Sequence, residues 1–226
     1  MKTAIISPIG KNSLHQSWLE NSSSDFLAIC YESVDDELLK DAKIVVHQKG
    51  HKYSLIKKLL DDNPGIVDQY DYFMLLDDDI ATSSKKIEEI FQIHSDNKLL
   101  LSQPALTRDS YFSHRITRRY WRKKVRFRYT NFVEMMCPIF SKESLKKCIH
   151  TFDSNKSGWG LDYIWPEILN FEGIAIIDEV CVKHTRKCGS LKRLMKEGIN
   201  PLEEAAEVKK IFNSSFIKPK NIKLIY

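Results

Sequence analysis

A run of three aspartates directly after a short apolar segment constrains this chain more than any other feature of its sequence. Tyr72 to Leu76 has the apolar and aromatic composition of a fully buried strand, and Asp77, Asp78 and Asp79 follow at once. Three carboxylates at such a strand end repel one another and are costly to hold there without a cation. Because side chains alternate between the faces of an extended backbone, Asp77 and Asp79 are expected to point the same way. Their oxygens suit Mg2+ or Mn2+ holding a substrate phosphate; the alternative is an acidic loop without a ligand.

The length and composition indicate one domain with a C-terminal appendage. The 226 residues are 42% hydrophobic and carry a modest formal net charge of +5. The five cysteines are widely spaced and include no CxxC pair, which favours reduced thiols over a disulfide framework or a zinc site. The N-terminal apolar stretch is too short for a signal peptide and no run reaches transmembrane length, so we predict a cytoplasmic protein.

Strand-like and helix-like segments alternate along the first third of the chain. Strands are expected at residues 3–6, 25–31 and 43–47, and helices at residues 12–18 and around residues 52–60. This repetition predicts an α/β fold with a largely parallel sheet, in which ligands bind beyond the carboxyl ends of the strands. A turn is expected from Ser7 to Gly10, on the same edge as the aspartates, which makes Ser7 and Pro8 candidate cofactor contacts.

Two lysines flank the start of the second predicted helix. Lys49 and Lys52 stand on either side of Gly50 and His51, where a helix N-terminus begins. Such a position suits a phosphate or a nucleotide base, and a solvated helix entrance is the alternative.

The second half of the chain continues the same alternation. Helices are expected at residues 84–94, 141–149 and from residue 201, and strands at residues 99–105, 126–132 and 173–182. The strand at 126–132 alternates charged and aromatic residues, which predicts one face in contact with water.

Residues 115–129 are the most basic stretch and interleave arginine and lysine with aromatic residues. This pattern is typical of a nucleic-acid surface, but it would equally serve an anionic acceptor, a lipid-linked pyrophosphate or a membrane face. A solvated basic loop is the remaining alternative. The C-terminal residues 216–226 are also basic and apolar, and either contact a membrane surface or pack back on the domain.

Further candidate site residues follow later in the chain. Glu134 interrupts an apolar segment, so it is turned either to solvent or toward a site. Gly160 follows Trp159 in a glycine-rich loop, and Asp162 stands where the next helix begins. An aspartate there either caps the helix or acts as a base or hydrogen-bond acceptor for substrate. His184 follows a predicted strand and is either a third metal ligand or a structural histidine.

Taken in order, these blocks resemble the GT-A fold of nucleotide-sugar-dependent glycosyltransferases. More narrowly, residues 70–184 are similar to the plant and bacterial family known as domain-of-unknown-function family 707. The resemblance rests on Tyr70–Tyr72 leading into the aspartates, Ser102–Leu106, Val133–Phe140, Trp159–Asp162 and the His184 segment. It covers about half of the chain; the first 50 residues match only as a generic nucleotide-binding half, and the tail after Ser190 has no match.

The resemblance implies a role for individual residues. In GT-A enzymes two carboxylates of the DxD motif hold Mn2+ or Mg2+ on the donor diphosphate, which maps to Asp77 and Asp79. A late histidine that completes the metal shell maps to His184. The acidic residue that contacts the acceptor hydroxyl, and deprotonates it in inverting enzymes, maps to Asp162. Because the middle residue, Asp78, is also a carboxylate, the two that bind the metal are left open.

The sequence therefore predicts a metal-dependent GT-A glycosyltransferase with a UDP-sugar as the favoured donor. We expect a catalytic domain at residues 1–190, with a nucleotide-binding half at 1–80 and an acceptor half at 81–190, and a basic-apolar tail at 191–226. The expected acceptor is a glycan or lipid-linked glycan in bacterial surface polysaccharide or lipopolysaccharide synthesis, at the inner face of the membrane.

The expected site residues fall into four groups. They are Asp162 for catalysis; Ser7, Pro8, Lys49, Lys52, Asp77 and Asp78 for the cofactor; Asp77, Asp79 and His184 for the metal; and Glu134, Trp159 and Gly160 for the substrate. Two alternatives stay open. One is a nucleic-acid-binding or nucleotidyl-processing protein that uses residues 115–129, although no nucleic acid is expected, and the other is a sugar-nucleotide-binding protein without activity.

Overall fold

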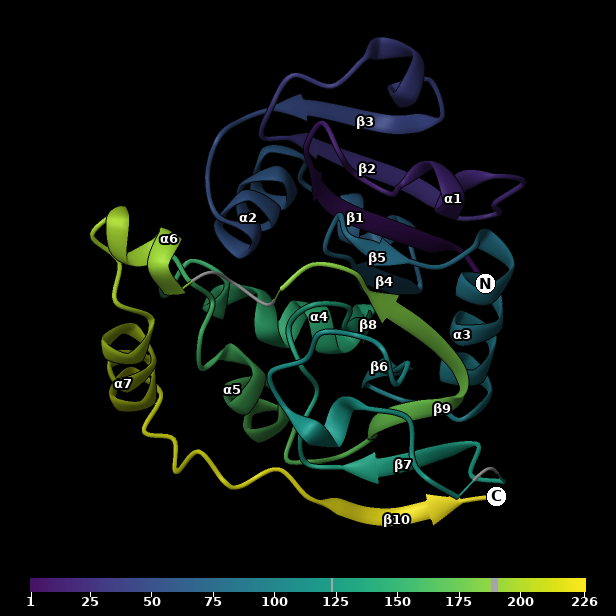
Figure 1. The fold of residues 1–226 in the computed structure, drawn as a ribbon, viewed down its shortest axis with the longest axis vertical. Helices are drawn as coiled ribbons and strands as arrows, with labels where there is room; N and C mark the ends of the chain where they lie inside the picture. Colours follow the sequence, from purple (N-terminus) through teal and green to yellow (C-terminus); the bar gives the residue numbers. More distant parts are fainter. Residues whose placement is uncertain (123, 188–190) are drawn as a thin grey trace.

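One large sheet organises the fold (Figure 1). The computed structural model describes residues 1–122, 124–187 and 191–226, so Lys123, Cys188 and the expected boundary at residue 190 lie outside the described residues. The strands are β1 (Thr3–Ile9), β2 (Asp25–Cys30), β3 (Ala42–His47), β4 (Tyr72–Leu75), β5 (Ile80–Ala81), β6 (Leu101–Leu106), β7 (Phe127–Thr130), β8 (Ile139–Ser141), β9 (Ile174–His184) and β10 (Asn221–Ile225). Their order is β10-β7-β9-β6-β8-β4-β1-β2-β3, and β5 pairs with β9 outside this row.

Helices cover both faces of the sheet. They are α1 (Gln16–Leu19), α2 (Lys52–Asp62), α3 (Ser84–Asp96), α4 (Lys142–Cys148), α5 (Leu161–Ile168), α6 (Leu191–Lys196) and α7 (Pro201–Ile211), with 3-10 turns at Asp36–Leu39, Ile66–Gln69, Arg115–Thr117 and Ile149–Thr151. Ala4 and Ile6 pack in one core with residues of α2, α4 and α5, whereas Ile5 and Ile9 pack in a second core with residues of α1 and α3. Since side chains alternate along a strand and both faces are covered, β1 is buried throughout.

The strands that carry the site run in the same direction. β1 is parallel to β2 and β4, and β6 is parallel to β9. β8 lies between β4 and β6 and is antiparallel to both, so β4 and β6 also share a direction. The predicted α/β fold with a largely parallel sheet is confirmed, with β7 and β8 running the other way. The carboxyl ends of β1, β2, β4 and β9 therefore meet at one edge of the sheet, beyond which ligands bind in such folds.

The first strand and the first helix differ from the prediction. β1 pairs with β2 as far as Ile9, so the turn expected from Ser7 was wrong. β4 pairs with β1 only up to Ile6, so β1 has no hydrogen-bonding partner on that side at Pro8. The absence of an N–H at Pro8 therefore costs no hydrogen bond to β4. The expected helix at residues 12–18 is only the short α1, because Leu14 instead donates its amide to the carbonyl of Asp78 and closes the loop over the aspartates.

The C-terminal segment packs back on the domain, which is one of the two outcomes expected for it. β10 is the edge strand beside β7. The water-exposed face predicted for residues 126–132 was wrong at Arg128, which is 2% exposed and pairs with buried Asp178. Within the described ranges, Cys30, Cys137, Cys148 and Cys181 are free thiols, and no helix is both long and apolar enough to cross a bilayer.

Candidate functional site

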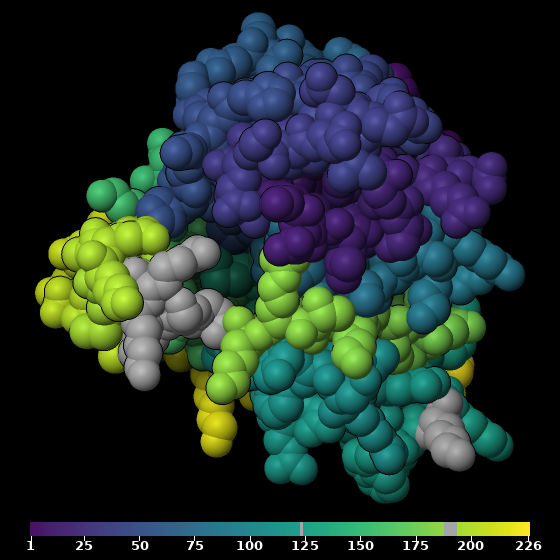
Figure 2. All heavy atoms as spheres, turned by 45° about the horizontal axis from the view of Figure 1, so that its top comes forward, coloured from purple at the N-terminus to yellow at the C-terminus, as the bar shows by residue number. Residues whose placement is uncertain are grey.

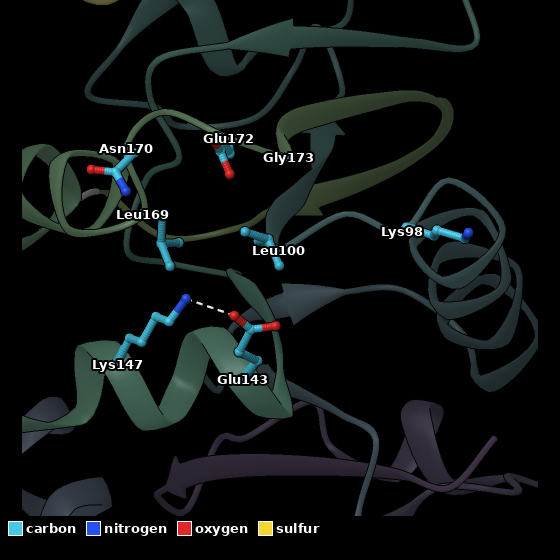
Figure 3. Close-up of a pocket in the computed structure, with 8 residues that line it drawn as sticks. All are labelled: Lys98, Leu100, Glu143, Lys147, Leu169, Asn170, Glu172 and Gly173. Atoms are coloured by element: carbon cyan, nitrogen blue, oxygen red, sulfur yellow. Dashed lines mark hydrogen bonds and ion pairs between the residues drawn. The ribbon is translucent and has the colours of Figure 1, made fainter.

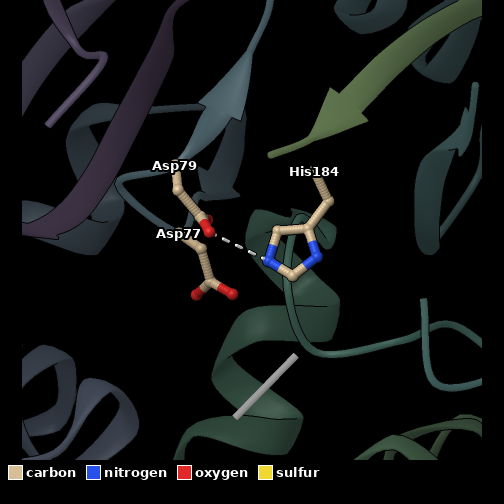
Figure 4. Close-up of side chains that lie close together, drawn as sticks. All are labelled: Asp77, Asp79 and His184. Carbon is tan, nitrogen blue, oxygen red and sulfur yellow. Dashed lines mark ion pairs between the residues drawn. The ribbon is translucent and has the colours of Figure 1, made fainter. Parts of the chain in front are cut away.

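Asp77, Asp79 and His184 converge where β4 and β9 end (Figure 4). Each offers one ligand atom, and these atoms all lie within 4.8 Å of one another. Nε2 of His184 lies 3.2 Å from Oδ2 of Asp79, and both side chains are buried. Figure 4 shows the carboxylate of Asp79 directed at the imidazole ring, with Asp77 beside the pair. Two carboxylates and an imidazole nitrogen form a donor set that suits a divalent cation.

A turn, rather than an extended backbone, brings the two carboxylates together. β4 ends at Leu75, and the amide of Ile80 donates to the carbonyl of Asp77, which closes the turn. The carbonyl of Asp79 accepts hydrogen bonds from the amide and the hydroxyl of Thr185, which fastens the turn to the end of β9. The expected proximity of Asp77 and Asp79 is confirmed, but the strand alternation expected to cause it was wrong.

Asp78 bonds to protein groups outside this cluster. Its Oδ2 accepts from the hydroxyl of Tyr31 at 2.8 Å and from the amide of Gly10 at 3.1 Å. Its Oδ1 accepts from Nη1 of Arg186 at 3.0 Å. Asp78 therefore joins the loops that follow β1, β2 and β9, and the other two aspartates are the pair that lies with His184.

Lys52, predicted as a phosphate contact, is largely buried and bonds to Asp77 and to backbone carbonyls beside the site. Its ammonium lies 2.7 Å from Oδ1 of Asp77 and donates to the backbone carbonyls of Leu75, Met135 and Met136. Burial raises the pKa of Asp77, and the Lys52 ammonium opposes that rise. Lys52 thus ties the aspartate turn to the segment before β8, and its contact with a phosphate stays a prediction.

The loop of residues 110–114, between β6 and β7, fixes the tautomer of His184. Nδ1 of His184 lies 3.1 Å from the carbonyl oxygen of Tyr111, and the amide of His184 donates to the hydroxyl of Ser110. Since a carbonyl oxygen only accepts, Nδ1 carries the proton of this hydrogen bond, and Nε2 is the ring nitrogen that faces Asp79 and the cluster. A histidine held in this way is preorganised as a metal ligand.

Glu134, expected either in solvent or at a site, is buried and bonds to the same loop. It is 2% exposed, and its Oε1 accepts from the amide of Ser113 at 3.2 Å. In the described part of the chain, no hydrogen-bond partner reaches its buried Oε2. Burial raises the pKa of Glu134 to about 7, while hydrogen bonds from Ser113 and Thr117 and the nearby His184 oppose the rise.

Asp162 lies in the first turn of α5, next to the same loop. It is 5% exposed; its Oδ2 is 3.8 Å from Nε2 of His114, and no partner among the described residues reaches its buried Oδ1. Burial raises the pKa of Asp162 to about 8, Glu134 adds to the rise, and backbone amides at the start of α5 oppose it. Burial also lowers the pKa of His114, which packs on the ring of Phe132. A buried carboxylate with a free oxygen and a pKa near neutrality can accept a proton from a hydroxyl.

The glycine-rich loop before α5 brings the helix close to the rest of the site. Gly158 and Gly160 have φ values of 78° and 96°, and a Cβ at Gly158 would meet Cε of Met135 at 2.1 Å. Only glycine fits such a position without strain, and half-buried Trp159 lies between the two. The loop therefore lets the segment that carries Asp162 pack against the segment that carries Glu134. Substrate contacts by Trp159 and Gly160 stay predictions.

The remaining predicted cofactor contacts lie on neighbouring strands and loops. Ser7 and Pro8 are buried in β1, and Lys49 is exposed in the loop before α2. Their contacts with a nucleotide also stay predictions.

Sequence reasoning missed Tyr31, Arg186 and His114. Tyr31 directly follows β2 and Arg186 follows β9, so both could have been found as polar side chains at strand ends on the site edge. His114 lies in an irregular loop, and no local pattern marks it.

The hollow drawn in Figure 3 is not part of this site. It has a volume of about 330 Å³ and lies near the amino ends of β6 and β9, at the opposite edge of the sheet. Its lining residues are Lys98, Leu100, Glu143, Lys147, Leu169, Asn170, Glu172 and Gly173. None of them is a predicted site residue, and Figure 3 shows the ion pair of Glu143 with Lys147 at its rim.

Comparison with known proteins identifies a family and a fold. The family model described as "Protein of unknown function (DUF707)" matches residues 32–217. No curated protein matches the chain.

Two solved structures of S. aureus TarS are similar to this chain. TarS 1–349 in complex with UDP-GlcNAc has a TM-score of 0.60 and 10% identity over 94% of this chain and 65% of that one. A second TarS structure has a TM-score of 0.54 and 10% identity over 96% of this chain and 44% of that one. This chain thus spans less than two thirds of either TarS chain. The likeness confirms the expected GT-A-like fold.

Proposed function

Given that the chain belongs to the DUF707 family and has a GT-A-like fold, we propose that it moves a sugar from a nucleotide-sugar donor to an acceptor hydroxyl. The observation that carries this proposal is the meeting of two groups at one sheet edge. The cluster of Asp77, Asp79 and His184 supplies ligand atoms for a cation that would bind the donor diphosphate. Asp162 supplies a carboxylate oxygen without a hydrogen bond to the described residues, which can act as a base. The 110–114 loop contacts both His184 and Asp162.

Asp77, Asp79 and His184 would hold Mn2+ or Mg2+, because their ligand atoms lie within 4.8 Å of one another and the hydrogen bond at Nδ1 turns Nε2 of His184 toward the cluster. Such a cation, when bound, offsets the negative charge of a departing nucleoside diphosphate. Lys52 holds Asp77 in place, and Asp78 fixes the surrounding loops. Ser7, Pro8 and Lys49, on the strands and loops beside this cluster, are proposed as further donor contacts.

Asp162 is proposed as the group that receives the proton of the acceptor hydroxyl. Its Oδ1 is buried and free of hydrogen bonds to the described residues, and its pKa of about 8 suits a base near neutral pH. Glu134 strengthens that basicity through its negative charge and offers its own free oxygen, Oε2, to the acceptor. Trp159 and Gly160, just before α5, complete the proposed acceptor side.

The donor and the setting are proposals of the same kind. The similar TarS structure holds UDP-GlcNAc, which supports a UDP-sugar as the donor. We propose a glycan acceptor in bacterial surface polysaccharide or lipopolysaccharide synthesis, at the cytoplasmic face of the membrane.

Thermal-shift measurements test the donor site. Wild type is screened with UDP, GDP, CMP and their sugars, with and without Mn2+, beside Asp79→Ala and a control, exposed Asp153→Ala. A nucleotide at 100 times its Kd stabilises the native state by about 2.7 kcal/mol. We expect one nucleotide to do so only with Mn2+, in wild type and Asp153→Ala but not in Asp79→Ala. No response to any nucleotide, or an equal response in Asp79→Ala, would overturn the proposal.

The base is tested separately, once a donor is known. Asp162→Asn should keep the metal-dependent thermal shift but lose transfer by about 10²–10⁴-fold, the usual contribution of a general base. Full activity in Asp162→Asn would remove Asp162 from the chemistry without affecting the donor-site proposal.

A further inference from the structure

The loop that joins β6 to β7 carries positive charge that the protein itself does not neutralise. Its exposed basic side chains include Arg108, Arg115, Arg119, Arg122 and Lys124, and we call residues 107–126 the basic lobe. The one carboxylate of the lobe, Asp109, pairs with Lys183. Within the described ranges, no carboxylate pairs with any of these exposed arginines or with Lys124. Figure 2 shows the lobe in teal, gathered on one face beside the light-green end of β9.

Several exposed lysines elsewhere in the protein have acidic partners. Lys40 pairs with Glu37, Lys58 with Asp62, and Lys147 with Glu143. The lobe therefore gathers on one loop several exposed arginines without acidic partners among the described residues, and Arg126, at its end, pairs with Glu179. An array of unpaired cations attracts a partner with many negative charges.

Exposed apolar side chains accompany these cations. Trp121 is 68% exposed, with the guanidinium of Arg122 4.8 Å from its ring centre. Arg122 also donates to the hydroxyl of Tyr226 at 3.3 Å, which joins β10 and its 57% exposed Ile222 to the same surface. Tryptophan, tyrosine and aliphatic side chains beside arginine are the composition of a surface that enters the headgroup region of a bilayer.

The aliphatic part of this surface favours a bilayer over a nucleic acid. A base-binding surface needs open aromatic faces for stacking. Here the guanidinium of Arg128 lies 5.2 Å from the ring centre of half-buried Tyr120, whereas Tyr111, Phe112 and Trp121 are exposed, so the aromatic side chains would serve either ligand. Ile222 offers nothing that a base or a phosphate recognises.

Buried groups anchor residues 118–120 of the lobe to the sheet. Arg128 donates to the carbonyl of Arg118 at 3.0 Å, and Asp178 accepts from the amide of Tyr120 at 2.6 Å. The amide of Arg119 donates to the carbonyl of Leu106, at the end of β6. A preformed surface loses little conformational entropy on binding.

We propose that the basic lobe, together with β10, docks the protein on a bilayer that contains anionic lipids. This inference does not depend on the proposed transfer reaction. The 110–114 loop belongs to the lobe and contacts His184, Glu134 and Asp162, so docking brings the site edge close to the lipid headgroups. If the proposed transfer is also correct, the acceptor is a glycan carried at the membrane surface.

Vesicle flotation tests the docking surface with the full chain. The probes are phosphatidylcholine vesicles with and without 30% phosphatidylglycerol, at low and high salt, and poly(U) RNA serves as a competing ligand. The lobe variant is Arg119→Gln/Arg122→Gln/Lys124→Gln. The matched control, Lys40→Gln/Lys58→Gln/Lys147→Gln, removes the same charge from lysines that have acidic partners.

We expect wild type and the control to bind only the anionic vesicles, and the lobe variant to lose about 100-fold in partitioning. Trp121→Ala should lose about 10-fold, and this loss should persist at high salt because it is apolar. Equal binding by the two triple variants would overturn the proposal. So would tight poly(U) binding without vesicle binding, which would assign the lobe to nucleic acid. Neither result would alter the nucleotide thermal shift, so this proposal and the transfer proposal fail independently.

Discussion

Two buried aspartates, Asp178 and Asp162, have opposite surroundings. Asp178 lies in β9 and is 2% exposed; Nε of Arg128 is 2.7 Å from its Oδ2, and the amide of Tyr120 donates to its Oδ1 at 2.6 Å. Asp162, in α5, is 5% exposed, and the described residues leave its Oδ1 without a hydrogen bond. Nε2 of His114 lies 3.8 Å from its Oδ2, and burial lowers the pKa of that histidine.

This difference separates a structural carboxylate from one available for chemistry. Burial raises the pKa of both, but the guanidinium of Arg128 opposes the rise at Asp178, whereas the charge of Glu134 adds to it at Asp162. An ion pair with hydrogen bonds on both oxygens compensates the loss of water. A buried oxygen without a partner costs stability, and proteins concentrate such costs at functional sites.

Removing the partner of Asp178 should make that aspartate resemble Asp162, and we expect this to be the largest effect. Arg128→Met leaves a buried charge uncompensated and should lower the free energy of unfolding by about 3–5 kcal/mol. Urea denaturation followed by circular dichroism measures the loss. The control is Arg126→Met, which breaks the half-exposed pair with Glu179 and should cost less than about 1 kcal/mol.

The double variant Arg128→Met/Asp178→Leu sharpens the same contrast. Replacing both partners with apolar side chains removes the buried charge, so most of the lost stability should return. If Arg128→Met costs no more than Arg126→Met, the compensation that distinguishes Asp178 from Asp162 does not exist.

The sequence predicted the part of the site that follows from strand order. Asp77, Asp79 and His184 each follow an apolar strand, and the parallel sheet brings their strand ends to one edge. The spacing of strand-like and helix-like segments, the composition of the buried strands and the resemblance predicted the fold.

The sequence did not predict contacts made by irregular segments. The 110–114 loop reaches Glu134 and Asp162 because β6 and β7 are held apart by β9, and no pattern inside the loop encodes that distance. Likewise, Arg128 is one of many arginines in a basic stretch, and only its register opposite β9 buries it beside Asp178. Such long-range pairings depend on tertiary packing, which overrides local pattern.

The free energy of unfolding should depend on pH through Asp162, and we expect this effect to be smaller than that of Arg128→Met. Its folded pKa of about 8 lies above the ordinary value of an aspartate, so the folded state holds a proton that the unfolded state releases. The contribution of this proton to the free energy of unfolding is fully present below about pH 4 and is lost as the pH rises to about 8. Between pH 5 and 8, wild type should therefore lose roughly 2–4 kcal/mol more than Asp162→Asn, measured by urea denaturation at each pH. A parallel decline in the two proteins would contradict the uncompensated burial of Asp162.

Glu134 provides the smallest and most specific test, because it acts on Asp162 only through its charge. Its own pKa of about 7 means that it ionises over the same range in which Asp162 titrates, and its charge then raises the pKa of Asp162. Glu134→Gln keeps the hydrogen bond from Ser113 but removes that charge, so the apparent pKa of Asp162 should fall by about half a unit to one unit. Carboxyl carbon NMR of Asp162 measures this shift, with exposed Glu143→Gln as the control variant. An unchanged pKa would show that burial alone sets the basicity of Asp162, and Glu134 would then remain only as a free oxygen beside the acceptor.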